Sequence, residues 1–184
     1  IRFCEKNKIY FIIDEAYIEF SHQKSFAQYI KKFQFLIILK SYSKTCGLPG
    51  IRTGYILSNQ RNIKKFGKLK SIYDVSSLSL AVVYFFEKNY SIINNYLNLI
   101  KKNRLYIKKI CFKQKLKYRI KEGNFFYLTF RKKITNKLIK TLIRKKILVK
   151  KINEKLISKQ DSSIRITIGS KIQINNFFNI IKKI

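Results

Sequence analysis

The chain has 184 residues, of which 46% are hydrophobic and 15% aromatic, so it is able to bury a sizeable core and is not expected to be disordered. No apolar run reaches the roughly 20 residues that a membrane-spanning helix requires, because lysines interrupt every candidate. The formal net charge of +32, from 41 basic and 9 acidic residues, would ordinarily favour a nucleic acid or an anionic membrane surface as partner.

The first third of the chain contains three short apolar runs, at residues 8–13, 35–39 and 53–57. Each run is predicted to be a buried strand, and residues 25–32, between the first two, are predicted to be helical. Continuous apolar runs of this length are typical of strands covered on both faces. We therefore expect an α/β fold with a mainly parallel sheet in this part of the chain.

The middle of the chain, residues 79–112, carries apolar side chains at helical spacing, among them Leu80, Val83 and Ile93. This spacing predicts one or two long helices, with a bend around Asn89.

The last third of the chain shows a different pattern, in which short strands alternate with helices. This alternation predicts a small α+β domain at residues 113–184, after a larger domain at residues 1–112 that includes the long helical segment. Strands are predicted at residues 125–130, 147–149 and 163–168, and helices at residues 137–145 and 171–184.

Polar residues gather at three places along these predicted elements. Residues 14–17 (DEAY) follow the first predicted strand, and residues 41–55 (SYSKTCGLPGIRTGY) follow the second. Arg165 lies inside the alternating strand at residues 163–168. Polar residues at the carboxyl ends of strands are where α/β folds bind ligands, so the first two groups are candidates for a shared site.

The first two groups contain the functional groups that pyridoxal phosphate requires. The cofactor needs an amine to hold its aldehyde as a Schiff base and a carboxylate to keep its pyridine nitrogen protonated. It also needs hydroxyls and a cation for its phosphate. Lys44 supplies the amine, Asp14 the carboxylate, Ser41 and Ser43 the hydroxyls and Arg52 the cation.

Each of these residues also has a purely structural interpretation. Asp14 and Glu15 could cap a following helix. Lys44 by itself could be one more solvated charge in a lysine-rich chain, and Arg52 and Arg165 could be surface cations. The catalytic interpretation therefore depends on the surrounding pattern rather than on any single residue.

The pattern resembles the fold-type I, class I/II aminotransferases and, within them, the histidinol-phosphate aminotransferase subgroup. The resemblance rests on DEAYIEF (14–20), SYSKTCGLPGIRTGY (41–55) and SIRITIG (163–169). YDVSSLSLAVV (73–83) is similar to the family's segment before its interdomain helix, and GNFFYLTF (123–130) to its small-domain strand. The resemblance implies the C-terminal part of a pyridoxal-phosphate-binding large domain, followed by a small α+β domain.

Carried over by position, the resemblance implies a role for each matching residue. Lys44 would carry the cofactor and move the substrate's proton, Asp14 would pair with the pyridine nitrogen, and Tyr17 would hydrogen-bond the ring oxygen. Arg165 would bind the anionic end of the substrate, and no metal is expected. The cofactor phosphate would be held by Ser41, Ser43 and Arg52.

The implied reaction is amino transfer between histidinol phosphate and 2-oxoglutarate in histidine biosynthesis. A threonine-phosphate decarboxylase or an aromatic aminotransferase of the same fold stays open, because a fold does not fix the substrate. Lys150 stands near the position where the family often has an arginine for the substrate phosphate. Lysine keeps the charge but loses the two-pronged geometry of arginine, which leaves the substrate open.

A basic nucleic-acid-binding module and an inactive remnant are the alternatives from other classes. However, the lysines are spread along the whole chain, and Ile, Asn, Phe and Tyr are abundant as well. These residues share A/T-rich codons with lysine, so a genome of that composition explains the charge. We therefore expect no specific nucleic-acid partner and no membrane partner.

The sequence contains no methionine, so we expect it to be a fragment of a longer protein. The resemblance implies a preceding stretch with a Gly-rich phosphate loop, a ring-stacking aromatic residue and an asparagine beside the ring oxygen. It also implies a homodimer in which residues of the partner subunit reach each site. The three cysteines are scattered, without the spacing of a metal or redox site, which favours a reducing, cytoplasmic compartment.

Overall fold

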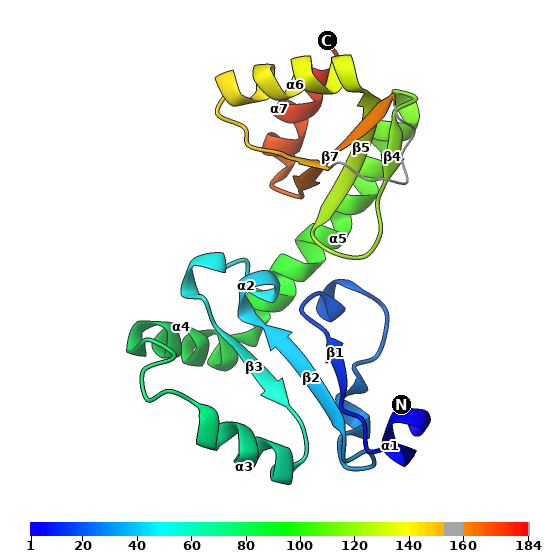
Figure 1. Cartoon of the computed structure of the whole chain (residues 1–184). Helices are drawn as coiled ribbons and strands as arrows, with labels where there is room; N and C mark the ends of the chain where they lie inside the picture. Colours follow the sequence, from blue (N-terminus) through cyan, green and yellow to red (C-terminus); the bar gives the residue numbers. More distant parts are fainter. Residues whose placement is uncertain (153–159, 184) are drawn as a thin grey trace. The chain divides into compact units, whose positions relative to one another are not determined.

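The computed structural model of the chain describes residues 1–152 and 160–183 (Figure 1). The chain divides into two compact units, Ile1–Leu97 and Asn98–Ile184. The dividing point lies within the long helix α5 (Tyr90–Lys113). The predicted limit between residues 112 and 113 marks the end of this helix, and its meaning as a domain boundary stays a prediction.

The first unit contains a three-stranded sheet in the order β1-β2-β3, formed by β1 (Phe11–Asp14), β2 (Leu36–Ser41) and β3 (Gly54–Leu57). All three predicted strands are therefore present, but only β2 is buried as predicted, whereas β1 and β3 leave Ile12 and Ile56 exposed. β1 and β2 are parallel, as expected, whereas β3 runs antiparallel to β2. An apolar run predicts that a strand is buried but not its direction, which depends on the length and path of the connection.

Helices of different lengths lie around this sheet, and several begin at a side-chain cap. Ser25 accepts a hydrogen bond from the backbone N–H of Ala27, so the helix predicted at residues 25–32 is present as a short 3₁₀ turn. The helices are α1 (Arg2–Lys6), η1 (Ile18–Phe20), η2 (Phe26–Tyr29), α2 (Tyr42–Thr45), η3 (Pro49–Ile51), α3 (Gln60–Leu69) and α4 (Ser77–Lys88).

The interruption at Asn89 confirms that the segment at residues 79–112 forms two long helices, α4 and α5. Asn89 follows the last residue of α4 and donates its side-chain amide to the carbonyl of Phe85. The carbonyl of Phe85 also accepts the backbone N–H of Asn89, so Asn89 closes the end of α4 with both its backbone and its side chain. Within the described residues, no helix is long and apolar enough to cross a membrane.

The second unit contains an antiparallel sheet in the order β4-β5-β7-β6. Helices α6 and α7 contribute Leu138, Leu142, Phe177 and Phe178 to the buried core of this unit. The strands are β4 (Lys117–Arg119), β5 (Phe125–Arg131), β6 (Lys150–Ile152) and β7 (Asp161–Thr167), and the helices are α6 (Lys132–Arg144) and α7 (Lys171–Ile181). The expected small α+β arrangement is therefore present, although residues 153–159 and Ile184 of the predicted domain lie outside the described part.

The strand predicted at residues 147–149 is wrong, because those residues follow the C-terminal cap of α6 and form no regular element. Lys146 adopts a left-handed conformation with φ of 57° and donates its N–H to the carbonyl of Ile143. Ile147 donates to the carbonyl of Leu142. This pair of bonds is a Schellman cap, in which an apolar residue packs after the turn, so β6 begins only at Lys150.

Candidate active site

The parallel pairing of β1 and β2 brings the first two polar groups to the same edge of the sheet. Asp14, the last residue of β1, is in register with Leu39, and β2 ends two residues later at Ser41. The backbone N–H of Glu15 extends the ladder by donating to the carbonyl of Leu39 at 2.9 Å. The two strands are therefore neighbours, as a shared site requires, and Figure 1 shows β1 and β2 side by side with α2 directly after β2.

Lys44 lies in α2, a single helical turn that begins directly after β2. Ser41 caps this turn, because its hydroxyl accepts a hydrogen bond from the N–H of Ser43 at 3.2 Å. A hydroxyl that accepts one bond can still donate its hydrogen to another oxygen, such as a phosphate oxygen. The ammonium of Lys44 is 6.0 Å from the centroid of the Tyr17 ring, so the two groups of polar residues meet at this edge.

Asp14 is exposed and shapes the turn that follows β1. Its Oδ1 accepts a hydrogen bond from the N–H of Ala16 at 2.9 Å, which is a local Asx-type turn. The helix-capping interpretation applies to Glu15 instead, because Glu15 Oε1 accepts the N–H of Phe26, the first residue of η2, at 2.7 Å. The carboxylate of Asp14 thus stays at the exposed edge of the sheet.

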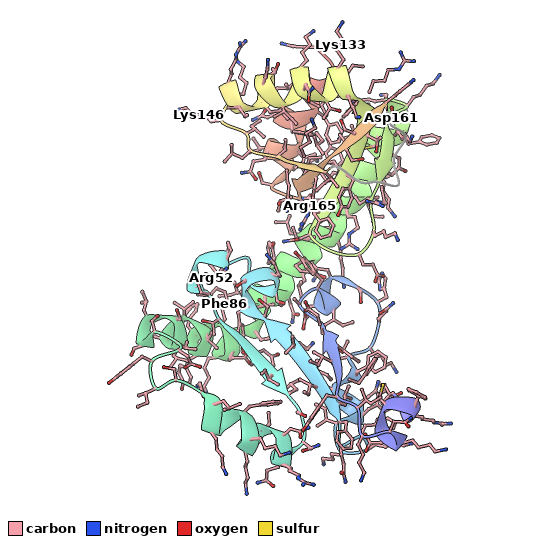
Figure 2. The ribbon with its side chains drawn as sticks, viewed as in Figure 1. Arg52, Phe86, Lys133, Lys146, Asp161 and Arg165 are labelled. Carbon is pink, nitrogen blue, oxygen red and sulfur yellow. The ribbon has the colours of Figure 1, made fainter. Side chains whose placement is uncertain are left out.

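Arg52 lies on the loop between α2 and β3, where Figure 2 labels it. It has a left-handed backbone with φ of 49°, and its Nη1 donates to the carbonyl of Pro49 at 3.0 Å. Ser79 fixes the same loop by donating its hydroxyl to the carbonyl of Ile51 at 2.8 Å. The described contact of Arg52 is therefore made within its own loop, and its role toward a phosphate stays a prediction.

Two of the glycines in this motif have clear physical reasons. Gly47 has φ of +67°, a conformation that costs little only for glycine. Gly54 begins β3 opposite Ser41, and a Cβ at this position would lie 2.6 Å from the backbone oxygen of Lys40. Gly54 thus permits the close approach of β3 to the end of β2.

Sequence reasoning missed a buried charge network beside the ends of β1 and β2. The ammonium of Lys40 is 3.1 Å from Glu15 Oε2 and 2.8 Å from Glu19 Oε1. The side chains of Lys40 and Glu15 are only 9% and 2% exposed. The only available signal was a lysine that directly follows the apolar run FLIIL, and forty other basic residues concealed it.

The network is strong enough to reverse the effect of burial on the pKa of both partners. Burial alone would raise the pKa of Glu15, but hydrogen bonds from Ser25 and Phe26 and the ammonium of Lys40 outweigh it, so the pKa lies below its ordinary value. Burial would likewise lower the pKa of Lys40, but Glu19 and Glu15 outweigh it and raise this pKa. Both groups are therefore charged at neutral pH.

Cys46 lies two residues after Lys44 but is not activated as a nucleophile. Burial, together with the nearby charges of Glu87 and Glu19, raises the pKa of its thiol to about 11. A thiol with such a pKa is protonated at neutral pH, and the thiolate is the reactive form.

Arg165 lies in β7, in the second unit, on the opposite face from its buried neighbours Ile164 and Ile166. Its guanidinium carbon is 3.9 Å from the centroid of the Phe125 ring, a cation–π contact. In the sheet register it stands between Tyr127 of β5 and Lys150 of β6. Arg165 is thus half-buried and oriented by an aromatic ring, as a recognition residue requires, and its assignment to a substrate stays a prediction.

The described part of the chain contains no group of three or more His, Cys, Asp or Glu side chains that could hold a metal ion. All three cysteines, Cys4, Cys46 and Cys111, are free. The groups present at the sheet edge are an amine, a carboxylate and several hydroxyls. They fit a phosphorylated aldehyde cofactor by the chemistry of the donor set.

The fold is that of the fold-type I pyridoxal-phosphate-dependent transferases. The family model for aminotransferase class I and II matches residues 1–181, and the chain therefore belongs to this family. Pyridoxal phosphate is the cofactor of the family. The resemblance based on the sequence motifs is thereby confirmed.

Individual relatives agree with this assignment. The histidinol-phosphate aminotransferase of Pyrococcus furiosus is 31% identical over 173 residues, which cover 94% of this chain and 47% of the relative. The crystal structure of the histidinol-phosphate aminotransferase from Clostridium acetobutylicum is similar with a TM-score of 0.83 at 25% identity, covering 99% of this chain and 56% of that chain. The L-threonine-O-3-phosphate decarboxylase from Porphyromonas gingivalis shares the fold, with a TM-score of 0.79 at 20% identity over 99% of this chain and 57% of that chain. The chain spans about half the length of the curated relatives it matches.

Proposed function

We propose that this chain is the C-terminal part of a pyridoxal-phosphate-dependent aminotransferase, in which Lys44 carries the cofactor. The proposed reaction is amino transfer between histidinol phosphate and 2-oxoglutarate in histidine biosynthesis. The names of the relatives support the amino donor, and family membership supports the class of reaction.

One observation carries the assignment of Lys44 above the other lysines of the chain. Its ammonium is 6.0 Å from the ring of Tyr17, at the edge where β1 and β2 end in parallel. Lys44 is half-buried, and a helical turn capped by Ser41 holds its backbone. Edges of this kind are where α/β sheets bind their ligands.

The chain's own residues have distinct tasks in this proposal. Lys44 attaches the cofactor and, once released, takes and returns the substrate's α-proton at its Nζ. Asp14 keeps the pyridine nitrogen protonated through its exposed carboxylate, and Tyr17 donates its hydroxyl to the ring oxygen. When bound, the cofactor supplies an electron-accepting ring that stabilises negative charge at the substrate carbon. The cofactor phosphate is held by Ser41, Ser43 and Arg52.

The second unit provides the candidate substrate residues. Arg165 and Lys150 are cross-strand neighbours, so two cations stand side by side on one sheet. Such a pair suits an anionic substrate group, with Arg165 as the residue able to make two parallel hydrogen bonds. The L-threonine-O-3-phosphate decarboxylase of the same fold keeps a second candidate activity open, because its substrate also carries a phosphate. Assays with histidinol phosphate and threonine phosphate distinguish the two reactions.

The proposal includes a longer protein and a second subunit. The matched relatives are about twice as long as this chain, and we propose that a preceding part supplies the remaining cofactor contacts. We further propose that the full-length protein is a homodimer in the cytoplasm. The three free cysteines support a reducing compartment.

Reductive labelling tests the role of Lys44 in the chain itself. The chain is incubated with pyridoxal phosphate, treated with borohydride to fix any lysine adduct, digested, and mapped by mass spectrometry. We expect the fraction of label on Lys44 to be well above the fraction that equal reaction of all lysines would give. The reason is that the neighbouring hydroxyls retain the cofactor phosphate at Lys44. Since the distribution of label is measured rather than the affinity, weak binding is sufficient.

Two variants control this experiment. Lys44→Ala is expected to remove the preferred label without changing the remaining pattern. Lys65→Ala removes an exposed lysine from α3 and is expected to leave the label on Lys44 unchanged. A label distributed over the lysines according to their exposure, with no preference for Lys44, would contradict the proposal.

A further inference from the structure

Lys40 is a buried cation that faces two carboxylates. It belongs to β2, one residue before Ser41, and its side chain is 9% exposed. Glu15 and Glu19 reach it from the segment after β1, at 3.1 and 2.8 Å. A buried ammonium between two carboxylates joins the end of one strand to the turn that follows the other.

The two carboxylates make further hydrogen bonds to separate segments of the first unit. Glu15 accepts the hydroxyl of Ser25 at 2.6 Å and the N–H of Phe26 at 2.7 Å. Glu19 accepts the hydroxyl of Thr45 at 3.2 Å, and Thr45 is the last residue of α2. The network therefore includes both strand ends, the start of η2 and the helical turn that carries Lys44.

Members of this network alternate along the chain with the residues proposed to hold the cofactor. Asp14 directly precedes Glu15, and Tyr17 lies between Glu15 and Glu19. On the other side, Ser41 follows Lys40, and Lys44 precedes Thr45. None of the described contacts of the network uses the side chain of Asp14 or Lys44.

Charge balance explains why the cation is essential to this arrangement. With Lys40 present, one positive charge faces two negative charges within hydrogen-bonding distance. Without it, two carboxylates would face each other in a buried place, and like charges at this separation repel. The segment after β1 would then move away from β2, and Tyr17 would move with it.

We propose that Lys40 is a positioning residue, which binds Glu15 and Glu19 so that Asp14 and Tyr17 stay opposite Lys44. This inference rests on the proposed function, since it assigns a purpose to the geometry of that site. Lys40 does not touch the cofactor in this proposal. It acts through the turn at residues 14–20.

Hydrogen exchange in the cofactor-free chain tests the structural half of the proposal. The reporters are the backbone N–H groups of Ile18, Phe20 and Ser21, which hydrogen-bond within the turn. In Lys40→Met we expect these three amides to exchange at least about tenfold faster, because the turn opens more often. Amides of β5 and β7 in the second unit are expected to keep their rates.

Three further variants separate positioning from a general loss of stability. Lys40→Arg keeps the cation and is expected to restore most of the protection. Lys65→Met removes an exposed lysine and is expected to change neither exchange nor labelling. If Lys40→Met does not fold, Glu19→Gln replaces it, because Glu19 is 20% exposed and its loss leaves the pair of Lys40 with Glu15.

The reductive label on Lys44 tests the functional half of the proposal. The structural half and the functional half are contradicted by different results. Faster exchange together with loss of the preference for Lys44 in Lys40→Met, and recovery of both in Lys40→Arg, supports the proposal. Unchanged exchange in Lys40→Met overturns it, and so does unchanged exchange in Glu19→Gln where Lys40→Met does not fold. Faster exchange with an unchanged preference for Lys44 also overturns it, because Lys40 would then be only structural. A wild-type chain that shows no preference for Lys44 contradicts the proposed function itself, before any variant is compared, and the positioning role falls with it.

Discussion

The two units of the chain differ in what they bury beside their apolar cores. In the second unit, the central strands bury Leu128 and Ile164 completely, under the apolar faces of helices. In the first unit, the central strand β2 buries Ile38 completely as well, but Ile12 and Ile56 of the outer strands are 58% and 43% exposed, and a lysine and a glutamate are buried at the sheet edge. The first unit therefore adds directional polar contacts to the apolar packing of its central strand, and these polar contacts lie beside the candidate site.

The difference teaches that a charged network supports the candidate site beside the apolar core formed by β2 and Phe20. Polar networks of this kind are sensitive to the loss of one member, because the remaining buried charges lose their partners. Apolar cores respond instead to changes of volume. Each of the following experiments tests whether the two units respond as differently as this account requires.

The largest expected effect comes from the core of the second unit. Leu128→Ala removes a side chain that is 0% exposed, and we expect a loss of about 2–5 kcal/mol in the free energy of unfolding of that unit. Urea denaturation with exchange of the β5 and β7 amides measures it. Ile134→Ala, on the exposed side of α6, is the control and is expected to cost far less. Faster exchange of the Ile18, Phe20 and Ser21 amides in Leu128→Ala would show that the units do not respond separately.

A smaller effect is expected at the close approach of β3 to β2. In Gly54→Ala the new Cβ would lie 2.6 Å from the backbone oxygen of Lys40, so the strands must separate, at a cost of about 1–3 kcal/mol. Gly50→Ala is the matched control, because no atom lies within 4 Å of its added Cβ. Equal stability of the two variants in urea denaturation would contradict the close approach. We also expect only Gly54→Ala to weaken the preferred label on Lys44.

The smallest expected effect is a change with pH, and its sign follows from the charged network. The pKa of Glu15 lies below its ordinary value of 4.5, so its contribution to stability is present above that value and is lost as the pH falls through the lowered pKa. The pKa of Lys40 lies above 10.5, so its contribution is present below that value and is lost as the pH rises through the raised pKa. The network thus stabilises the first unit across the neutral range.

Comparison of two variants shows whether this pH dependence comes from the charged network. The difference in unfolding free energy between wild type and Lys40→Met is expected to shrink on acidification below about pH 4.5, because Glu15 loses its charge as the pH falls through its lowered pKa. The corresponding difference for Leu128→Ala, an apolar substitution, is expected to stay constant. Parallel pH curves for the two variants would contradict the distinction between the units.

Much of the fold was predictable because apolar runs and apolar periodicity favour strands and helices, although the burial predicted for β1 and β3 was not found. The strands ending near Asp14 and Ser41 and the pair of helices separated at Asn89 were all predicted from this signal. The antiparallel direction of β3 was not predictable, since it depends on the path of the loop. The strand β4 (Lys117–Arg119) was missed because its three residues are all exposed and two of them are charged.

The candidate site was predictable only where several residue types form a pattern. Lys44 was identified through the serines and glycines around it, and the parallel ends of β1 and β2 meet the geometric condition for this identification. Lys40 has no such pattern, and its importance depends on burial and on two glutamates that are distant along the chain. Burial of a charge is a property of the folded chain, so composition alone could not distinguish Lys40 from the other lysines.

The absorbance spectrum of the chain with pyridoxal phosphate tests the central claim most directly. A lysine adduct of the cofactor absorbs at about 410–430 nm, and the account predicts such a band in the wild-type chain and in Lys65→Ala. In Lys44→Ala the band is predicted to fall to the low intensity that the other lysines give. A band of equal intensity in Lys44→Ala, or the absence of any band in the wild-type chain, would contradict the claim that Lys44 carries the cofactor.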